Sequence, residues 1–124
     1  RARPVEPEGF DDVARSLAEG RAVRNARTTG SVCDAILTPS PGKLTLPVLE
    51  RLAGPGLAVS DDEALHAMVL AFRYLRLVLE PGGAVALAAA LFRKEFLTGQ
   101  SVVAVATGGN VDHAVYNKAL SRLG

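Results

Sequence analysis

The sequence predicts an α/β fold, in which a layered, mainly parallel sheet carries helices on both faces. The run from Val102 to Ala106 is unbroken, apolar and rich in β-branched residues, as in a strand covered on both faces. Other short apolar runs alternate along the chain with segments of helical periodicity, which indicates parallel strands joined by helices. We therefore expect Ser101–Asn110 to be a strand and its turn, leading into a helix at Val111–Leu123.

The turn TGGN at residues 107–110 has two interpretations. In folds of this class, ligands bind where a strand ends and a helix begins, because free backbone N–H groups converge there. Gly108 and Gly109 would let the backbone approach a ligand, and Thr107 and Asn110 offer uncharged polar side chains. Alternatively, the two glycines only make the bend of an ordinary turn. The residues alone leave both interpretations open.

The composition is that of one globular domain. The chain has 124 residues and a formal net charge of +1, so nothing in it indicates a nucleic-acid or anionic membrane partner. The longest apolar stretch, Ala84–Phe92, is too short to cross a bilayer. The single cysteine, Cys33, excludes an internal disulfide and indicates a reducing, cytoplasmic location.

The first residues predict a strand and a helix. Arg3–Glu6 has the pattern of a strand entered midway. A sheet made only of this chain's strands would be small and have open edges, so we expect the chain to be part of a larger fold. Gly9–Gly20 is predicted to be a short helix that Asp11 or Asp12 caps and that Gly20 ends.

The middle of the chain begins with an irregular stretch. Val32–Leu37 is predicted to be a short strand or a loop, since two prolines follow it. Cys33 has no basic neighbour to lower its thiol pKa and is predicted to be small and buried. Leu44–Ala53 has helical spacing, and Leu57–Val59 is predicted to be a brief strand.

A capping box at Ser60–Glu63 marks the start of a helix. Its apolar stripe comprises Leu65, Met68, Phe72, Leu75 and Leu79. We therefore expect this helix to continue to Leu79 and to place Met68 and Phe72 in the core. Ala84–Phe92 is apolar all round and predicts a buried helix, after which Arg93–Gln100 is a polar connection.

Glu80 lies between these two apolar segments and is followed by the helix-breaking residues Pro-Gly-Gly. Burying an unpaired carboxylate is costly. Glu80 therefore lies either at a wet helix junction or against a polar cavity, and the second alternative makes it a candidate site residue.

Several segments together resemble one known family. They are VEPEGFDD at residues 5–12, TTGSVCDAILTPSPGKLTLPVLERL at 28–52, LAVSDDEALHAMVLAFRYLRLVLEPGGAVALAA at 57–89 and VVAVATGGNVD at 102–112. Their order and spacing are similar to those of the serine/threonine dehydratases, which are fold type II pyridoxal-phosphate (PLP) enzymes. This group includes threonine ammonia-lyases, serine racemases and hydroxyaspartate dehydratases.

The resemblance implies a tryptophan-synthase-β-like fold, of which residues 1–124 form the C-terminal part of the large cofactor domain. Neither Lys43, Lys94 nor Lys118 resembles the family's Schiff-base lysine, so the N-terminal part and the small domain are expected outside this chain. The complete homodimer would convert a β-hydroxy amino acid, such as threonine or serine, to a 2-oxo acid and ammonia. The isolated chain would be inactive. The alternative is a non-catalytic remnant that binds a partner through its unpaired sheet edges.

The resemblance also implies roles for the turn residues. Thr107 matches the family's Ser/Thr whose hydroxyl hydrogen-bonds the pyridine nitrogen of PLP, and Gly108, Gly109 and Asn110 would shape the turn beneath the ring. A hydroxyl supplies no full negative charge, so the nitrogen would stay largely unprotonated and the ring would be a weaker electron sink. That property suits the expulsion of a β-hydroxyl group.

Other positions follow from the same resemblance. Glu80 matches a glutamate near the cofactor, while Asp34 and Ala35 match an Asp-Gly pair bordering the ring, with alanine in place of glycine.

In some members of the family, the acidic loop near the start holds a divalent cation. Glu6, the backbone carbonyl of Phe10 and Asp12 occupy the matching positions, and oxygen ligands suit Mg²⁺ or Ca²⁺. A role of Asp12 as a helix cap explains the same residue.

Overall fold

The computed structural model describes residues 1–97 and 101–123. Within them, two short parallel strands pair: β1 (Val5–Pro7) and β2 (Leu57–Val59), with Val5 opposite Leu57. The strands expected at the start of the chain and at Leu57–Val59 are thus confirmed. So is the α/β class with parallel pairing.

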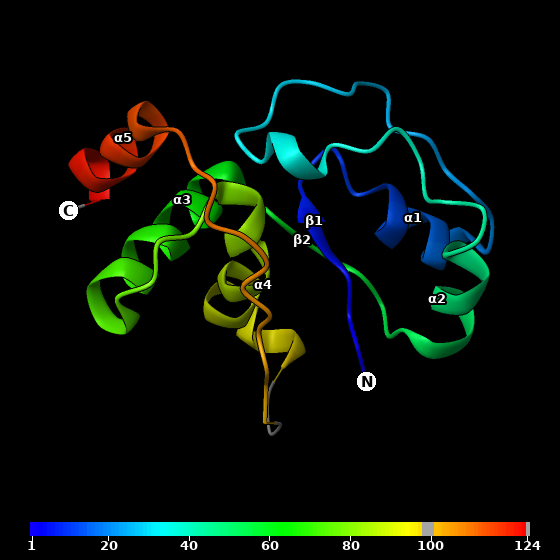
Figure 1. Ribbon diagram of the computed structural model, residues 1–124. Coiled ribbons are helices and arrows are strands. Elements are labelled where there is room, and N and C mark those ends of the chain that lie inside the picture. The colour runs from blue at the N-terminus through cyan, green and yellow to red at the C-terminus, as the bar shows by residue number, and fades with distance from the viewer. Residues whose placement is uncertain (98–100, 124) are drawn as a thin grey trace.

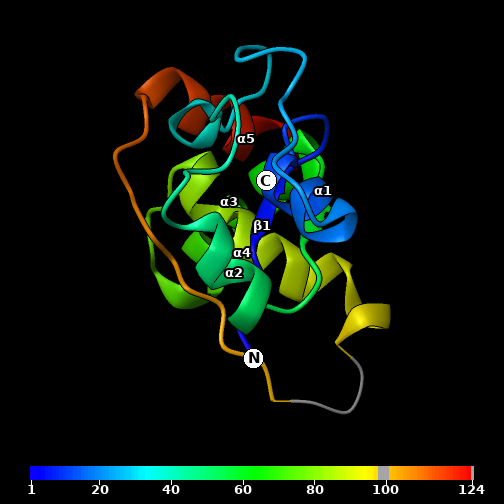
Figure 2. The same ribbon diagram turned by 90° about the vertical axis from the view of Figure 1, so that its right-hand side faces the viewer.

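Helices lie on both sides of these strands (Figures 1 and 2). On one side are α1 (Asp12–Glu19) and α2 (Leu46–Leu52), and on the other are α3 (Asp61–Leu70), α4 (Pro81–Phe92) and α5 (His113–Leu123). The expected helix positions are confirmed to within a few residues at their ends, except the end of α3. No helix in residues 1–97 and 101–123 combines the length and the apolar character needed to span a membrane.

The hydrophobic core lies where α3 and α4 pack against the sheet. Alanines at the contact let the two helices approach closely, and Met68 and Val59 are fully buried among them. α4 is buried as expected, but it begins at Pro81 and not at Ala84. The reason is that proline at the first helical position has its φ angle preset and needs no N–H partner there. The sequence EPGG therefore starts this helix.

α3 begins as the sequence predicts and ends earlier. The Ser60 Oγ accepts the Glu63 N–H at 3.2 Å, and the Glu63 carboxylate accepts the Ser60 N–H at 2.8 Å, which completes the capping box. The prediction that the helix continues to Leu79 is wrong. A single π-helical turn, Ala71–Leu75, follows α3, and Arg76 then takes a left-handed conformation with φ of 59°.

The early end of α3 changes the place of its apolar stripe. Met68 lies in the core as predicted, but Phe72 is 37% exposed and packs edge-on against Tyr116. Leu79 is buried from an extended segment that returns toward the core, and not from a helix. The 3.6-residue spacing of the apolar residues could not reveal the early end of α3, because that spacing continues to Leu79 although the backbone reverses at Arg76.

The expected strand at Val102–Ala106 is absent, and this prediction is wrong. Residues 101–110 are irregular, and Val103 and Val105 are 89% and 64% exposed. The segment runs along α4 (orange in Figure 1), with no strand beside it in the described part of the chain. A strand needs a partner for its backbone groups, and apolar composition alone does not supply one. Of the polar connection before it, residues 98–100 lie outside the described residues.

The stretch around Cys33 is a loop with one 3₁₀ turn, Asp34–Ile36, and not a strand. Cys33 is 1% exposed, and burial raises the pKa of its thiol to about 12. The prediction of a small buried thiol is confirmed.

Candidate functional site

The turn at residues 107–110 meets the start of α4. The Glu80 N–H donates to the Gly108 carbonyl at 3.1 Å. A side chain at Gly108 would overlap the Glu80 carboxylate, and one at Gly83 would overlap the Gly108 backbone. Neither glycine has a positive φ, so close approach and not backbone conformation requires them. Their observed neighbour is the N-terminus of α4, which neither interpretation of the turn anticipated.

Thr107 and Ala35 line the same hollow, here called the β1 groove. It has a volume of about 540 Å³. Its walls are Ala2, Arg3, Val5, Glu6, Ala35, Ile36, Thr38, Gly82, Val85, Ala86, Val103, Val105 and Thr107. Most of these side chains are apolar, and the Thr107 hydroxyl is one of few polar groups on the wall.

Ala35 also lines a second hollow of about 330 Å³, together with Asp34, Glu80 and Asn110. Glu80 is half-buried at the residue before α4 and makes no side-chain capping bond. Two segments far apart in the sequence, the 3₁₀ turn and the 107–110 turn, thus lie on either side of the α4 N-terminus. The structure brings Thr107, Glu80, Asn110 and Ala35 to adjoining hollows that share Ala35.

This donor set fits one part of a PLP site. A hydroxyl on an apolar wall suits an uncharged pyridine nitrogen, because it can donate one hydrogen bond without adding charge. No lysine lines either hollow in the described part of the chain. The described residues that line these two hollows therefore include a hydroxyl suited to a ring nitrogen and no amine.

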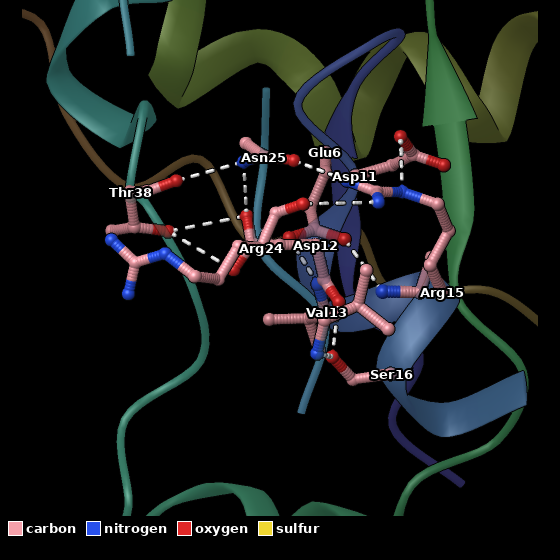
Figure 3. A network of polar contacts seen from close by, with 11 residues as sticks. Glu6, Asp11, Asp12, Val13, Arg15, Ser16, Arg24, Asn25 and Thr38 are labelled. Atoms are coloured by element: carbon pink, nitrogen blue, oxygen red, sulfur yellow. Dashed lines mark hydrogen bonds and ion pairs between the residues drawn. The ribbon is translucent and has the colours of Figure 1, made fainter. Parts of the chain in front are cut away.

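A buried polar network surrounds Glu6 at the end of β1 (Figure 3). The Glu6 carboxylate accepts the N–H groups of Val13 and Ala14 at 3.0 and 2.8 Å. It therefore caps α1 from a neighbouring strand. The prediction that Asp11 or Asp12 caps this helix is wrong, since neither side chain does so. α1 points its N-terminus at the carboxyl end of β1, where a glutamate reaches the free amides.

Asp12 has a different role. It is fully buried, and its carboxylate accepts the Asn25 Nδ2–H at 2.7 Å and lies 3.4 Å from the Thr38 hydroxyl. Asn25 also donates to the Thr38 carbonyl at 2.8 Å. In Figure 3 these side chains, from α1 and from two loops, point toward one another. The network ties the loop after α1 to the loop that carries Thr38.

The charge in this network is unbalanced. Burial raises the pKa of Glu6 to about 7; the two backbone N–H groups lower it in part, and the nearby Asp12 carboxylate raises it. Neither Glu6 nor Asp12 forms an ion pair within residues 1–97 and 101–123. Two adjacent buried carboxylates suit a divalent cation in donor type. A group of three acidic, His or Cys side chains placed to hold a metal is not found among the described residues.

Arg93 is a key residue that sequence reasoning assigned to a polar connection. Its guanidinium donates to both carboxylate oxygens of Glu63, to the Ala58 carbonyl at 3.1 Å and to Glu8 at 3.2 Å. Burial raises the pKa of Glu63, but the bonds from Arg93 and Ser60 outweigh it and lower the pKa. Arg93 follows α4 directly, where cations favour a helix C-terminus, and that position was its only sequence signal.

Comparison with known proteins gives the chain's relationships. Residues 1–108 match the family model described as "Pyridoxal-phosphate dependent enzyme". An L-threo-3-hydroxyaspartate ammonia-lyase from a Pseudomonas species is 34% identical over 94% of this chain and 36% of its own length. The serine racemase of Dictyostelium discoideum is 32% identical over 94% of this chain and 37% of its length.

A solved structure agrees with this relationship. The T.th. threonine deaminase has a TM-score of 0.81 and 37% identity, over 87% of this chain and 36% of that one. The described elements therefore have the arrangement found in a fold type II PLP enzyme. The chain spans a little more than a third of the length of these relatives.

Proposed function

Since the chain belongs to the family of pyridoxal-phosphate dependent enzymes, we propose that it forms part of the large domain of an ammonia-lyase. The complete enzyme would convert a β-hydroxy amino acid of the threonine or serine type to a 2-oxo acid and ammonia. We further propose a cytoplasmic homodimer, in which the N-terminal part and the small domain supply the Schiff-base lysine. The observation that carries the proposal is the position of Thr107 on an apolar wall beside Ala35, next to Glu80.

Each residue has a role in the proposed site. When bound, PLP supplies an electron sink for the substrate's amino carbon. Thr107 donates its hydroxyl hydrogen to the pyridine nitrogen and, being neutral, leaves that nitrogen without a proton. The apolar residues of the β1 groove exclude water from this bond and so strengthen it. Gly108 holds the turn against Glu80, which orients the hydroxyl.

A divalent cation is a second part of the proposal. Glu6, Asp12 and the Phe10 carbonyl would hold Mg²⁺ or Ca²⁺, whose charge would offset the repulsion between the two carboxylates. The bound cation would then stabilise the start of α1. EDTA should lower the melting temperature of the complete enzyme, and Asp12→Asn should abolish that sensitivity. An EDTA-insensitive melt of the parent would refute the cation site.

The main test uses the complete protein encoded with this chain. We expect it to purify with the absorbance of bound PLP and to release ammonia from threonine, serine or 3-hydroxyaspartate. The isolated chain mixed with PLP should release no more than free PLP does. A complete protein without bound cofactor, or without ammonia release from any of the three, would contradict the ammonia-lyase proposal and favour a non-catalytic module.

A further inference from the structure

A carboxylate at the start of α3 binds the loop that leads to Ala35. Asp61 is the first residue of α3, and one of its carboxylate oxygens accepts the Ser31 hydroxyl hydrogen at 2.5 Å. The other oxygen accepts the Val32 N–H at 3.2 Å. The Ser31 Oγ in turn accepts the Cys33 N–H at 3.0 Å. Asp61 therefore bonds, directly or through Ser31, to three successive residues that lie about 30 positions earlier in the sequence.

These three residues lead straight into the wall that the two hollows share. Val32 lines the second hollow, and Ala35 lines both the second hollow and the β1 groove. The 3₁₀ turn Asp34–Ile36 follows Cys33 directly, and the Ile36 N–H donates to the Cys33 carbonyl at 3.1 Å. Bonds that fix residues 31–33 thus also fix the start of the turn that carries Ala35.

The far side of this turn packs against α4. A Cβ at Gly82 would lie 3.4 Å from the Ile36 side chain and 3.8 Å from the Ala35 Cβ, so the turn lies close to the first turn of the helix. This packing is apolar, and van der Waals contact has little directional preference. The hydrogen bonds to Asp61 are directional, and they therefore set the orientation of the loop as well as its distance.

Stabilisation of α3 alone does not account for the bonds of Asp61. Asp61, Asp62 and Glu63 all lie in the first turn of α3, where the helix dipole favours negative charge. Ser60 and Glu63 already make the cap. Asp62 is exposed and pairs with Arg122 at 3.4 Å, whereas Asp61 forms none of the ion pairs within residues 1–97 and 101–123. The partners of Asp61 are the donors of the loop.

We propose that Asp61 is a positioning residue of the cofactor site, which holds residues 31–33 and thereby sets where Ala35 lies on the wall shared by the two hollows. Asp61 lines neither hollow, so it acts through the loop and does not touch the cofactor. This inference rests on the proposed function, because the PLP ring is proposed to lie against that wall. Without the carboxylate, the Val32 N–H would lose its acceptor and the loop would shift to reach water.

Two matched variants of the complete enzyme test the effect on the cofactor. Asp61→Ala and Asp62→Ala each remove one negative charge from the same helical turn and introduce the same residue, so their effects on α3 itself should be similar. Asp61→Ala should weaken PLP binding about tenfold or more, while Asp62→Ala should stay within about twofold of the parent, as measured by absorbance titration. Equal affinities of the two variants would overturn the proposal.

Cys33 reports the position of the loop independently of the cofactor. Its thiol is 1% exposed, so an alkylating reagent reaches it only when the loop opens. In the complete enzyme freed of PLP, alkylation of Cys33 should be about tenfold faster in Asp61→Ala than in the parent and unchanged in Asp62→Ala. Mass spectrometry of the Cys33 peptide measures the rate, at a temperature where melting curves show all three proteins folded. Equal rates in the two variants would contradict a role of Asp61 in holding the loop.

The other partner of the hydrogen bond provides a second pair of variants. Ser31→Ala removes only the hydroxyl and should weaken PLP binding and speed Cys33 alkylation in the same direction as Asp61→Ala. Ser31→Thr keeps a hydroxyl and should restore both properties toward the parent values. If Asp61→Ala does not fold, this pair decides, and a Ser31→Ala variant equal to the parent in both properties would overturn the proposal.

The outcomes separate this inference from the proposed function. A complete enzyme that binds PLP, with equal affinities in Asp61→Ala and Asp62→Ala, would refute the positioning role and leave the proposed function intact. A complete protein that binds no PLP, but whose Asp61→Ala variant is alkylated faster at Cys33, would refute the proposed function and support the role of Asp61 in holding the loop.

Discussion

Two regions of this molecule reverse the usual placement of side chains. In the network around Asp12, charged and polar groups are buried: Asp12 and Ser16 are 0% exposed and Asn25 is 9% exposed. In residues 101–107, by contrast, valines face outward, with Val103 at 89%. Burial of a polar group and exposure of an apolar one are both costly, and the two regions differ in whether the cost is offset.

The difference lies in where each region finds its partners. The Asp12 carboxylate accepts hydrogen bonds from the side chains of Asn25 and Thr38. The Ser16 Oγ donates to the Asp12 carbonyl at 2.6 Å and accepts the Val23 N–H at 2.8 Å. All of these groups lie within residues 12–38 of the described chain. Residues 102–106 have no strand to pair with in the described residues. The composition of a segment therefore determines which hydrogen-bond and packing partners would stabilise it. Whether those partners are present depends on the segments that lie beside it.

The largest effect is expected where the partners are internal. Asp12→Ala would leave the buried Asn25 amide without its acceptor and open a polar cavity, so the free energy of unfolding should fall by about 2–4 kcal/mol. Urea denaturation of the chain measures it. Asp11→Ala is the control, because it removes only a part-exposed ion pair with Arg15 and should cost less than about 1 kcal/mol. Equal losses would show that the Asp12 network is not what stabilises this region.

The same network should make stability depend on pH. The pKa of Glu6 is about 7 in the folded chain and 4.5 ordinarily, so between these values the folded state binds more protons than the unfolded state. Its contribution is therefore fully present below about pH 4.5 and declines as pH rises through 7, by roughly 1–3 kcal/mol in metal-free buffer. Glu6→Gln cannot ionise and should flatten this part of the profile. Parallel profiles for both proteins would contradict the assignment.

Signals carried by neighbouring residues were readable in the sequence. The capping box at Ser60–Glu63, the left-handed Gly20 that ends α1 and the buried Cys33 are all local, and each was predicted. The end of α3 before Arg76 was not readable, because the apolar stripe continues while a π-helical turn closes the backbone. The prediction of a strand at residues 102–106 failed for the opposite reason: the composition is that of a strand, but no strand pairs with it among the described residues.

The candidate site likewise has residues that the sequence identified and an arrangement that it did not. Thr107 and Glu80 were singled out by their sequence surroundings and by resemblance, and Ala35 by resemblance alone, but neither could show that these residues line adjoining hollows. Glu6 lies on a strand and caps the helix that follows it, whereas Arg93 binds Glu63, which lies 30 positions away in the sequence. A charged residue's partner at that separation depends on how the elements pack, which a single sequence does not state.

A substitution at Thr107, at the end of the outward-facing segment, should change cofactor affinity. If Thr107 has the proposed role in the complete enzyme, Thr107→Val would remove the donor to the pyridine nitrogen and leave a buried acceptor unpaired. PLP affinity should fall roughly tenfold or more, which corresponds to about 1–3 kcal/mol. Thr107→Ser keeps the hydroxyl and should bind PLP like the parent. Cofactor titration followed by absorbance measures both. A valine variant with parental affinity would mean that Thr107 does not face the ring.

The smallest effect is expected at Tyr116, whose side chain has one part with a partner in the described chain and one part without. Its ring packs against Phe72 at a centroid distance of 5.9 Å, while its buried hydroxyl has no hydrogen-bond partner among the described residues. Tyr116→Phe keeps the ring contact and removes the unpaired group, so the isolated chain should be unchanged or more stable by up to about 1 kcal/mol. Tyr74→Phe, at a side chain 76% exposed, is the control and should have no effect. If the rest of the enzyme supplies a partner for this hydroxyl, the sign reverses in the complete protein and Tyr116→Phe becomes destabilising. Urea denaturation of both forms measures the sign, and a loss of stability in the isolated chain would show that the hydroxyl is already satisfied there.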